Sequence, residues 1–472
     1  MASPIKVKAI FDIGKTNKKF LLFDEHFSVV YRNQVTQDQM EDDDGYPCEN
    51  LDRLVIWIKE ECNKALQQKK YQITDMNFTT YGATLVHLDK NRNVITPLYN
   101  YLKPYPDDVA KKFYIRYGGR KRLSLQTASP PMGMLNSGLQ LYWLKQKKSE
   151  IFAKIDQTLH FPQYISYLFT GYLCSELTSI GCHTAMWDFE SGNYHDWIRE
   201  EGMEVLLPEI QPVSSTRQID YGRLTVQTGI GIHDSSAALA PFLFATDKPF
   251  IQLSTGTWSV AFNPFTSDPL TYEELEKDSL YYMNIYGKPV KASRLFLGNE
   301  YTHQLQKIGQ YFGRPKDRID CEPEFVLFQK LARHESPQHK FIFEKMSSPG
   351  VHQSNENNGR DLSRFNSYEE ACHQLMLDLV LIQLKAMQLV WGSTEINQIV
   401  ITGGFSQNDF FTRLLATFLP GKKIYTASIP DASALGAMLV MGNETHNQYF
   451  IQKLMEWKTH NPFESLNLKG YK

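Results

Sequence analysis

The stretch FDIGKTNKKFLLFD, residues 11–24, constrains the fold most strongly, because its layout returns near the middle of the chain. In both places an apolar strand ends in a glycine turn and a second apolar strand follows; the second copy is FIQLSTGTWSVAFNP, residues 250–264. Asp12-Ile13-Gly14 and Ser254-Thr255-Gly256 occupy the same place in the two copies. A repeat at about half the chain length favours two homologous domains. Chance similarity over so few residues is the alternative.

The chain has 472 residues, which is too long for one compact core. We predict two domains, 1–246 and 247–472, with a linker near residues 245–249. Apolar spacing predicts strands, helices and turns in a mixed α/β order. The expected elements include strands over Val7–Ile13 and Lys19–Phe23, a helix over Leu51–Leu66 and a helical middle from Leu139 to Gly171.

The composition excludes several classes of partner. The chain has 50 basic and 52 acidic residues, a formal net charge of −2, and no dense block of Lys or Arg, so we expect no nucleic acid as partner. No apolar run is long enough to span a bilayer, so we expect no membrane partner and a soluble, cytoplasmic protein. The six cysteines lack CxxC spacing, so we expect reduced thiols and no zinc site: Cys48, Cys62, Cys174, Cys182, Cys321 and Cys372.

The first glycine turn has the composition of an anion-binding loop. Backbone N–H groups at a glycine, hydroxyl and amide donors and lysine charges can together bind phosphate; the residues are Gly14, Lys15, Thr16, Asn17 and Lys19. Asp12 ends the first strand, where a carboxylate is unusual unless it faces a cation, and Mg²⁺ accompanies nucleotide phosphates. The alternative is an exposed hairpin whose Lys and Asn residues simply favour turns.

Two further turns have compositions suited to a nucleotide. In the second copy of the repeat, Ser254, Thr255 and Thr257 surround Gly256, and their hydroxyls suit β- and γ-phosphate oxygens. The run VITGGFSQNDFF ends a strand at Gly403-Gly404, where a ring or ribose can approach the backbone, with Asn408 as a hydrogen-bond partner. Ordinary β-turns and a helix start are the alternatives. Both the G-x-G-x-x-G fingerprint and a Walker A sequence are absent.

The segment GIGIHDSSAALAPFL, residues 229–243, contains the candidate general base. Glycines precede His233-Asp234, and small residues then continue as a helix, so Asp234 lies at a helix N-terminus. A simple helix N-cap is the alternative. Between two phosphate-binding halves, such a carboxylate is well placed to take a proton from a substrate hydroxyl as that oxygen attacks phosphorus.

These four stretches, in this order and at these separations, resemble the FGGY family of carbohydrate kinases over nearly the whole chain. The resemblance implies an α/β fold of two ribonuclease-H-like domains, of the actin/hexokinase ATPase type, facing a central cleft. It implies ATP and Mg²⁺ as cofactors, with Asp12 toward the metal and Asp234 as catalytic base. It assigns phosphate to Gly14, Thr16, Lys19, Ser254, Gly256 and Thr257, and adenosine to Gly403, Gly404, Asn408, Ala434, Gly436 and Ala437.

Details of the match concern the sugar. The pairs His233-Asp234 and Thr16-Asn17 are similar to kinases of 6-deoxy-ketohexoses such as L-rhamnulose and L-fuculose, while a ketopentose such as xylulose remains open. The candidate sugar contacts are Tyr81, Gly82, Ala83, His87, Gln163 and His233. Lys15 departs from the family pattern, where Thr or Ala is usual, and adds a cation near the phosphates. The expected partner is a small-molecule sugar, and a homodimer is compatible with the sequence.

The main alternative is a catalytically inactive sugar-sensing or scaffold protein on the same fold. An actin- or chaperone-like ATPase gives no reason for an Asp in a glycine loop. A dehydrogenase is disfavoured because the dinucleotide fingerprint is missing.

Overall fold

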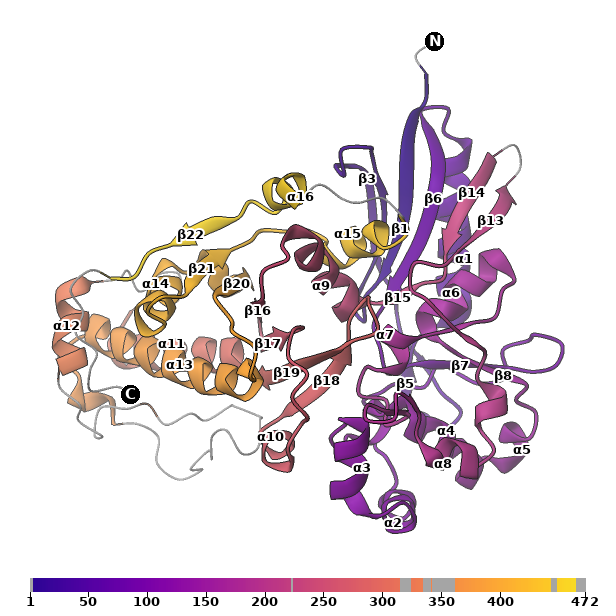
Figure 1. The fold of residues 1–472 in the computed structure, drawn as a ribbon, viewed down its shortest axis with the longest axis horizontal. Coiled ribbons are helices and arrows are strands. Elements are labelled where there is room, and N and C mark those ends of the chain that lie inside the picture. The colour runs from indigo at the N-terminus through magenta and orange to yellow at the C-terminus, as the bar shows by residue number, and fades with distance from the viewer. Residues whose placement is uncertain are drawn as a thin grey trace. The chain divides into compact units, whose positions relative to one another are not determined.

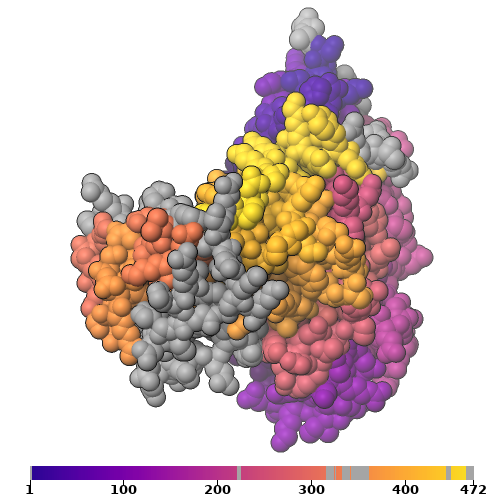
Figure 2. All heavy atoms as spheres, turned by 60° about the vertical axis from the view of Figure 1, so that its left-hand side comes forward, coloured from indigo at the N-terminus to yellow at the C-terminus, as the bar shows by residue number. Residues whose placement is uncertain are grey.

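The computed structural model describes residues 3–221, 224–314, 324–333, 341, 361–442 and 448–463, and the remaining residues are grey in Figures 1 and 2. The chain forms two compact units. Unit 1 contains residues 1–245, 281–289 and 431–447, and unit 2 contains residues 246–280, 290–430 and 448–472. The division near residue 245 lies beside the predicted linker, but two later segments of the chain return to unit 1.

Unit 1 is built on a seven-stranded mixed sheet (Figure 1). Its order is β13-β14-β6-β1-β2-β3, and the short β15 also pairs with β6. The first strand pairs antiparallel with β2 and parallel with β6. The bounds are β1 (Ile5–Ile13), β2 (Asn17–Phe23), β3 (Val29–Thr36), β6 (Tyr71–Thr80), β13 (Thr216–Tyr221), β14 (Leu224–Gly229) and β15 (Ile232–His233).

Unit 2 repeats this pattern of pairing. Its seven-stranded sheet has the order β18-β19-β17-β16-β20-β21-β22, although residues 281–283 of β18 and Pro289 of β19 are grouped with unit 1. Here β16 pairs antiparallel with β17 and parallel with β20, as β1 does with β2 and β6, so the predicted internal repeat is confirmed. The bounds are β16 (Phe250–Thr255), β17 (Ser259–Asn263), β18 (Ser279–Met283), β19 (Pro289–Leu295), β20 (Gln398–Gly403), β21 (Lys423–Thr426) and β22 (Lys458–His460).

Both units also contain helices, several of which pack on the sheets. In unit 1 they are α1 (Leu51–Gln67), α2 (Asp107–Arg116), α3 (Gly119–Thr127), α4 (Ser137–Lys147), α5 (Ser149–Phe152), α6 (Phe161–Thr170), α7 (Leu177–Ile180), α8 (Asp196–Glu200), α9 (Asp234–Ala245) and α15 (Ala432–Leu439). In unit 2 they are α10 (Tyr272–Glu276), α11 (Leu297–Tyr311), α12 (Phe325–Arg333), α13 (Tyr368–Trp391), α14 (Asp409–Phe418) and α16 (Gln448–Leu454).

The short strands of unit 1 correct one expectation. The stretch from Leu139 to Gly171 is not continuously helical, because β8 (Gln157–His160) interrupts it and pairs with β7 (Leu85–Leu88). Pairing with a distant strand outweighs local helix propensity there. The other short strands are β4 (Met40–Glu41), β5 (Pro47–Cys48), β9 (Ser175–Glu176), β10 (Trp187–Asp188), β11 (Asn193–Tyr194) and β12 (Ile210–Gln211).

Helix α13 forms the centre of unit 2. It is the one helix in the described part of the chain that is long and apolar enough to cross a membrane, and 67% of its apolar stretch is buried inside the protein. Its side chains join the main apolar core of unit 2, as expected of a core helix. Five cysteines are free and buried, and Cys321 lies outside the described residues.

Helix α15 returns to unit 1 and packs directly on α9, beside β1 and β6 (Figure 1). A Cβ atom at Gly436 would lie 1.8 Å from the Ala237 carbonyl oxygen, so only glycine allows this approach. Asn77 Nδ2 donates to the Ala437 carbonyl oxygen at 2.7 Å. Through these contacts, a segment late in the sequence becomes part of the first unit.

We expect Gly436→Ala to destabilise unit 1, because the added methyl group meets backbone atoms of α9 that cannot rotate away. The free energy of unfolding should fall by about 1–3 kcal/mol, as is typical of overpacking. Denaturant unfolding measures it. Gly404→Ala is the control, since its Cβ would meet no atom within 4 Å. Equal stability of the two variants would contradict the packing argument.

Candidate functional site

Asp12 lies at the centre of a polar network in unit 1. Its side chain is only 7% exposed at the end of β1. Ser433 Oγ donates to its Oδ2 at 2.9 Å, and Lys19 Nζ lies 3.4 Å from the same oxygen. Lys19 also pairs with Asp431 at 3.1 Å, and Arg32 pairs with Asp431 as well. Asp12 and Lys19 face each other because they are direct partners in the β1–β2 register.

The charged neighbours in this network offset the effect of burial on the pKa values of Asp12 and Lys19. Burial raises the pKa of Asp12, an effect that the Lys19 charge and the Ser433 hydrogen bond reduce. Burial alone would lower the pKa of Lys19, but Asp12 and Asp431 hold it above its ordinary value. Lys19 therefore stays charged between two carboxylates, in a position where it can also meet an anionic ligand.

Asp234 begins α9, as predicted. Burial raises the pKa of its carboxyl to about 6, although hydrogen bonds from the Ser235 backbone and hydroxyl oppose the shift. The side chain keeps 32% of its exposure, so a ligand can still reach it. A carboxylate whose pKa lies just below neutrality suits a general base, because it is ionised at neutral pH yet binds a proton readily.

His233 precedes Asp234 and is held tightly by its neighbours. Its Nε2 lies 3.3 Å from Cys182 Sγ and 3.4 Å from Asp234 Oδ1, and its ring stacks on Tyr282. A Cβ atom at Gly82 would lie 2.7 Å from His233 Nε2. The predicted residue Gly82 thus makes room for the histidine ring. Burial lowers the pKa of His233 to about 4, so the imidazole is neutral at neutral pH.

Several buried polar atoms close to Asp234 lack a hydrogen-bond partner within the described residues. They are His233 Nδ1, His160 Nε2 and the Gln163 carbonyl oxygen Oε1. The pKa of His160 is lowered to about 4, mainly by burial and further by the nearby His233. Gln163 Nε2 donates to the Gly231 carbonyl oxygen at 3.0 Å. Unpaired buried polar groups are costly, so their gathering around the base loop calls for a functional explanation.

His160 was not among the residues singled out from the sequence. It ends β8, and only the pairing of β8 with β7 places it near the base loop. By contrast, His87 Nδ1 is 2.9 Å from Thr158 Oγ1 between the same two strands. Ala83 is buried, and its carbonyl oxygen accepts a hydrogen bond from Gln140.

The first turn is partly closed by its own hydrogen bonds. The Gly14 N–H donates to the Asn17 carbonyl oxygen at 2.9 Å, and Lys18 Nζ donates to the carbonyl oxygens of Gly14 and Lys15. Thr16 and Asn17 are exposed. Their side chains remain accessible to a ligand, whereas the Gly14 N–H is already used.

Lys15 lies among aromatic rings. Its ammonium lies 5.1 Å from the centre of the Tyr81 ring and 5.3 Å from that of Tyr101. Burial lowers the pKa of Lys15, whereas burial and then the charge of Asp234 raise the pKa of Tyr101. The Tyr81 hydroxyl donates to Glu49 at 3.3 Å, so the ring is what Tyr81 offers to Lys15. Lys15 thus lies beside Tyr101, a residue close enough to Asp234 for the charge of Asp234 to raise its pKa.

Unit 2 contains a pocket of about 390 Å³ at its own glycine turn. The start of α11 contributes Gly298, Asn299, Tyr301 and Thr302, which the sequence did not single out. Two N–H groups of this first turn are already bonded, because Asn299 donates to the Thr257 carbonyl oxygen and Glu300 to the Phe296 carbonyl oxygen, each at 3.2 Å. The full lining is Gly256, Thr257, Gly298, Asn299, Tyr301, Thr302, Gly404, Phe405 and Asn408.

Close backbone packing shapes this pocket. Cβ atoms at Gly298 and Gly403 would lie 2.0 Å and 1.7 Å from the carbonyl oxygens of Gly256 and Thr255. The Thr255 hydroxyl accepts from the Phe405 N–H at 3.0 Å and donates to the Thr402 carbonyl oxygen. Asn408 caps α14 by accepting from the Phe411 N–H.

The other predicted nucleotide contacts lie elsewhere. Ser254 is half-buried within β16. Ala434 and Gly436 are buried in α15 of unit 1 and are not among the pocket-lining residues.

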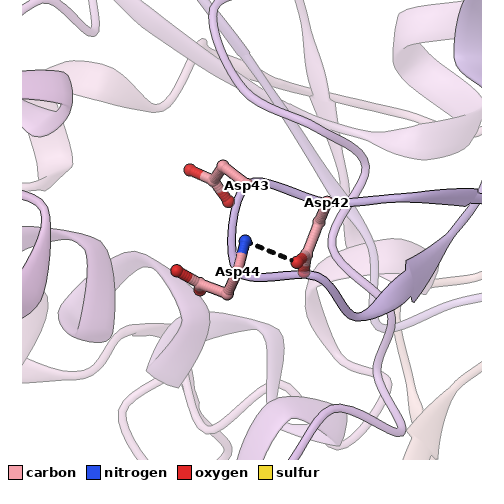
Figure 3. Close-up of side chains that lie close together, drawn as sticks. All are labelled: Asp42, Asp43 and Asp44. Atoms are coloured by element: carbon pink, nitrogen blue, oxygen red, sulfur yellow. Dashed lines mark hydrogen bonds between the residues drawn. The ribbon is translucent and has the colours of Figure 1, made fainter.

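An acidic cluster at Asp42, Asp43 and Asp44 is a weak metal candidate (Figure 3). Its carboxylates already pair with two lysines: Lys103 binds Asp42 and Asp44 at 2.6 and 2.5 Å, and Lys148 binds Asp43 and Asp44 at 2.7 and 2.8 Å. Asp42 also accepts the Asp44 N–H at 2.9 Å. These contacts explain the cluster as a turn held by ion pairs.

Comparison with known proteins matches two family models. Residues 7–233 match the N-terminal domain of the FGGY family of carbohydrate kinases, and residues 247–449 match the C-terminal domain of the FGGY carbohydrate kinases. The rhamnulokinase of Oceanobacillus iheyensis is 22% identical over 84% of both chains. The rhamnulokinase of Halalkalibacterium halodurans is 25% identical, but that match spans only 52% of each chain, about half of the enzyme.

The fold matches a solved structure over nearly its whole length. A carbohydrate kinase from Novosphingobium aromaticivorans superimposes with a TM-score of 0.79 over 98% of both chains, at 22% identity. This likeness supports the two-domain mixed α/β fold.

Proposed function

The chain belongs to the FGGY family of carbohydrate kinases, and from this membership we propose that it transfers the γ-phosphoryl group of ATP to a hydroxyl of a ketose. The single observation that carries the residue assignment is Asp234, a carboxylate that burial shifts to a pKa of about 6 and that stays 32% exposed beside unpaired polar groups. This is the environment that a general base for a sugar hydroxyl requires.

The acceptor that we propose is a 6-deoxy-ketohexose such as L-rhamnulose or L-fuculose. The two rhamnulokinases that share 22–25% of their aligned residues support this class, as does the His233-Asp234 pair. A ketopentose such as xylulose is the second candidate. Neutral His233, His160 and Gln163 offer both donors and acceptors, as sugar hydroxyls require.

The phosphates of ATP are assigned to the pocket of unit 2. Its glycine walls let the phosphates approach the backbone, and the N-terminus of α11 contributes a favourable helix dipole. Thr257 offers a hydroxyl to the same oxygens. Gly404 and Asn408 extend the pocket toward the expected adenosine side.

Asp12 and Lys19 are assigned to the charge of the transferred group. Asp12 offers one carboxylate in a network that already includes a hydroxyl and an ammonium, which fits Mg²⁺ held largely through water and phosphate oxygens. Mg²⁺, when bound, offsets charge on the phosphoryl oxygens. Lys19 stays protonated between Asp12 and Asp431 and offers a second cation to the phosphoryl group.

In-line transfer of the phosphoryl group requires the γ-phosphorus of ATP to lie next to a sugar hydroxyl that is bound beside Asp234. We infer that the two units close on the bound substrates, which would align the reacting atoms and exclude water as a competing acceptor. Asp234 then accepts the hydroxyl proton while the oxygen attacks phosphorus. Because such transition states are loose, the base contributes only part of the rate.

The substrate assignment is tested by coupled ADP release over 6-deoxy-ketohexoses, ketopentoses, polyols and aldoses. We expect the highest kcat/KM with L-rhamnulose or L-fuculose. Binding of a sugar without ADP release would instead identify the inactive sugar sensor, and ATP hydrolysis independent of any sugar would contradict both.

We expect Asp234→Asn to lower kcat by about 10²- to 10⁴-fold while sugar and ATP still bind, because only proton transfer is lost. The pH dependence follows from the raised pKa. The base is ionised above its pKa of about 6, so kcat/KM of the native enzyme should fall as the pH drops below that value. The residual activity of Asp234→Asn should not show this fall at low pH. If the variant still shows the same fall, a group other than Asp234 causes it.

We expect Lys15→Met to raise KM for the sugar about tenfold, as expected for loss of a charged donor, and to leave KM for ATP nearly unchanged. The reason is the position of Lys15 over Tyr81 and Tyr101. Steady-state kinetics measures both constants, with the exposed Lys90→Met as control. A variant with a higher KM for ATP and an unchanged KM for the sugar would contradict this expectation and assign Lys15 to phosphate binding.

A further inference from the structure

The hydroxyl of Thr178 connects a buried acid to the loop that carries Asp234. Thr178 Oγ1 accepts from the His233 backbone N–H at 3.1 Å and donates to Glu176 Oε2. Thr178 is fully buried, and Glu176 and His233 are nearly so. The three residues form a chain of hydrogen bonds within unit 1 that ends one residue before the proposed base.

The direction of this chain follows from proton counting. A backbone N–H can only donate, and a threonine hydroxyl has one proton and two lone pairs. Glu176 Oε2 accepts the hydrogen bond from the hydroxyl, so a lone pair of Thr178 Oγ1 faces the His233 N–H. Glu176 also accepts the N–H groups of Thr178 at 2.8 Å and Ser179 at 3.3 Å. Its oxygens are thus occupied by α7, and they orient the Thr178 hydroxyl.

Other contacts hold the same loop from different sides. The strand β15 pairs with β6, with His233 opposite Thr80. Ser236 Oγ donates to the Met283 carbonyl oxygen at 2.7 Å in the first turn of α9. The His233 N–H belongs to the residue directly before Asp234, and the Thr178 hydroxyl is its partner. Loss of that partner leaves a buried N–H unpaired and frees one side of the loop.

We propose that Thr178, oriented by Glu176, positions the base Asp234 by anchoring the backbone of His233. The proposal rests on the proposed function, in which Asp234 is the base. Glu176 and Thr178 act through His233 and are therefore positioning residues.

Glu176 lies on the wall of a separate recess of about 550 Å³, together with residues such as Val213, Phe244 and Tyr286.

Thr178→Val and Thr178→Ser form the matched pair that tests this. Valine keeps the shape but removes the acceptor, so we expect kcat to fall about ten- to a hundredfold, the scale of a misplaced catalytic group, with KM for ATP little changed. Serine keeps the hydroxyl and should retain kcat within about threefold of the native enzyme. Thr412→Val, a fully buried threonine in α14 of unit 2, controls for loss of a buried hydroxyl.

Amide hydrogen exchange of residues 230–236 provides a readout that needs no activity. Exchange there should be faster in Thr178→Val and native-like in Thr178→Ser and Thr412→Val. Glu176→Gln cannot accept all three hydrogen bonds and should show intermediate exchange and a lower kcat. Native kcat in Glu176→Gln would remove the orienting role of Glu176.

Native exchange and kcat in Thr178→Val would overturn the proposal, as would equal losses in the valine and serine variants. If the native enzyme phosphorylates no sugar, the proposed function fails. The exchange data still decide whether Thr178 anchors the loop.

Discussion

The contact between α9 and α15 is the constraint on which the rest of unit 1 depends. Gly436 allows the two helices to touch through their backbones. Because α15 is held there, Ser433 reaches Asp12 and Asp431 reaches Lys19. Because α9 is held there, Asp234 begins its helix beside the end of β6. One close helix pair thus positions the network of Asp12 and the proposed base together.

Burial has opposite consequences for the acids and the histidines of this region. It raises the pKa values of Asp12 and Asp234 but lowers those of His233 and His160, so near neutral pH the imidazoles are uncharged. A neutral imidazole can both donate and accept, as a hydroxyl-rich ligand requires. Lys19 keeps its charge because two carboxylates flank it. Unit 1 therefore offers a charged donor at Lys19 and neutral donors at His233 and His160.

The sequence was sufficient to find those site residues that stand in a recognisable local sequence pattern. Asp12 and Asp234 stand beside glycines at the ends of apolar runs, and both are carboxylates with raised pKa values in the structure. His160 and Thr178 could not be found in this way. Their positions depend on the pairing of β7 with β8 and on the contact of α7 with the base loop, and no local pattern reports either contact.

The sequence by itself determined the repeated strand-turn-strand units, the mixed α/β class and the family resemblance, because these depend on the alternation of apolar residues and the spacing of glycines. Only the tertiary structure decided where the side chains of the first turn point: Lys19 toward Asp12 and Asp431, Lys15 toward two tyrosine rings. Ser433 and Asp12 lie 421 positions apart and share a hydrogen bond. Such a contact has no local signal, because packing of whole elements brings its partners together.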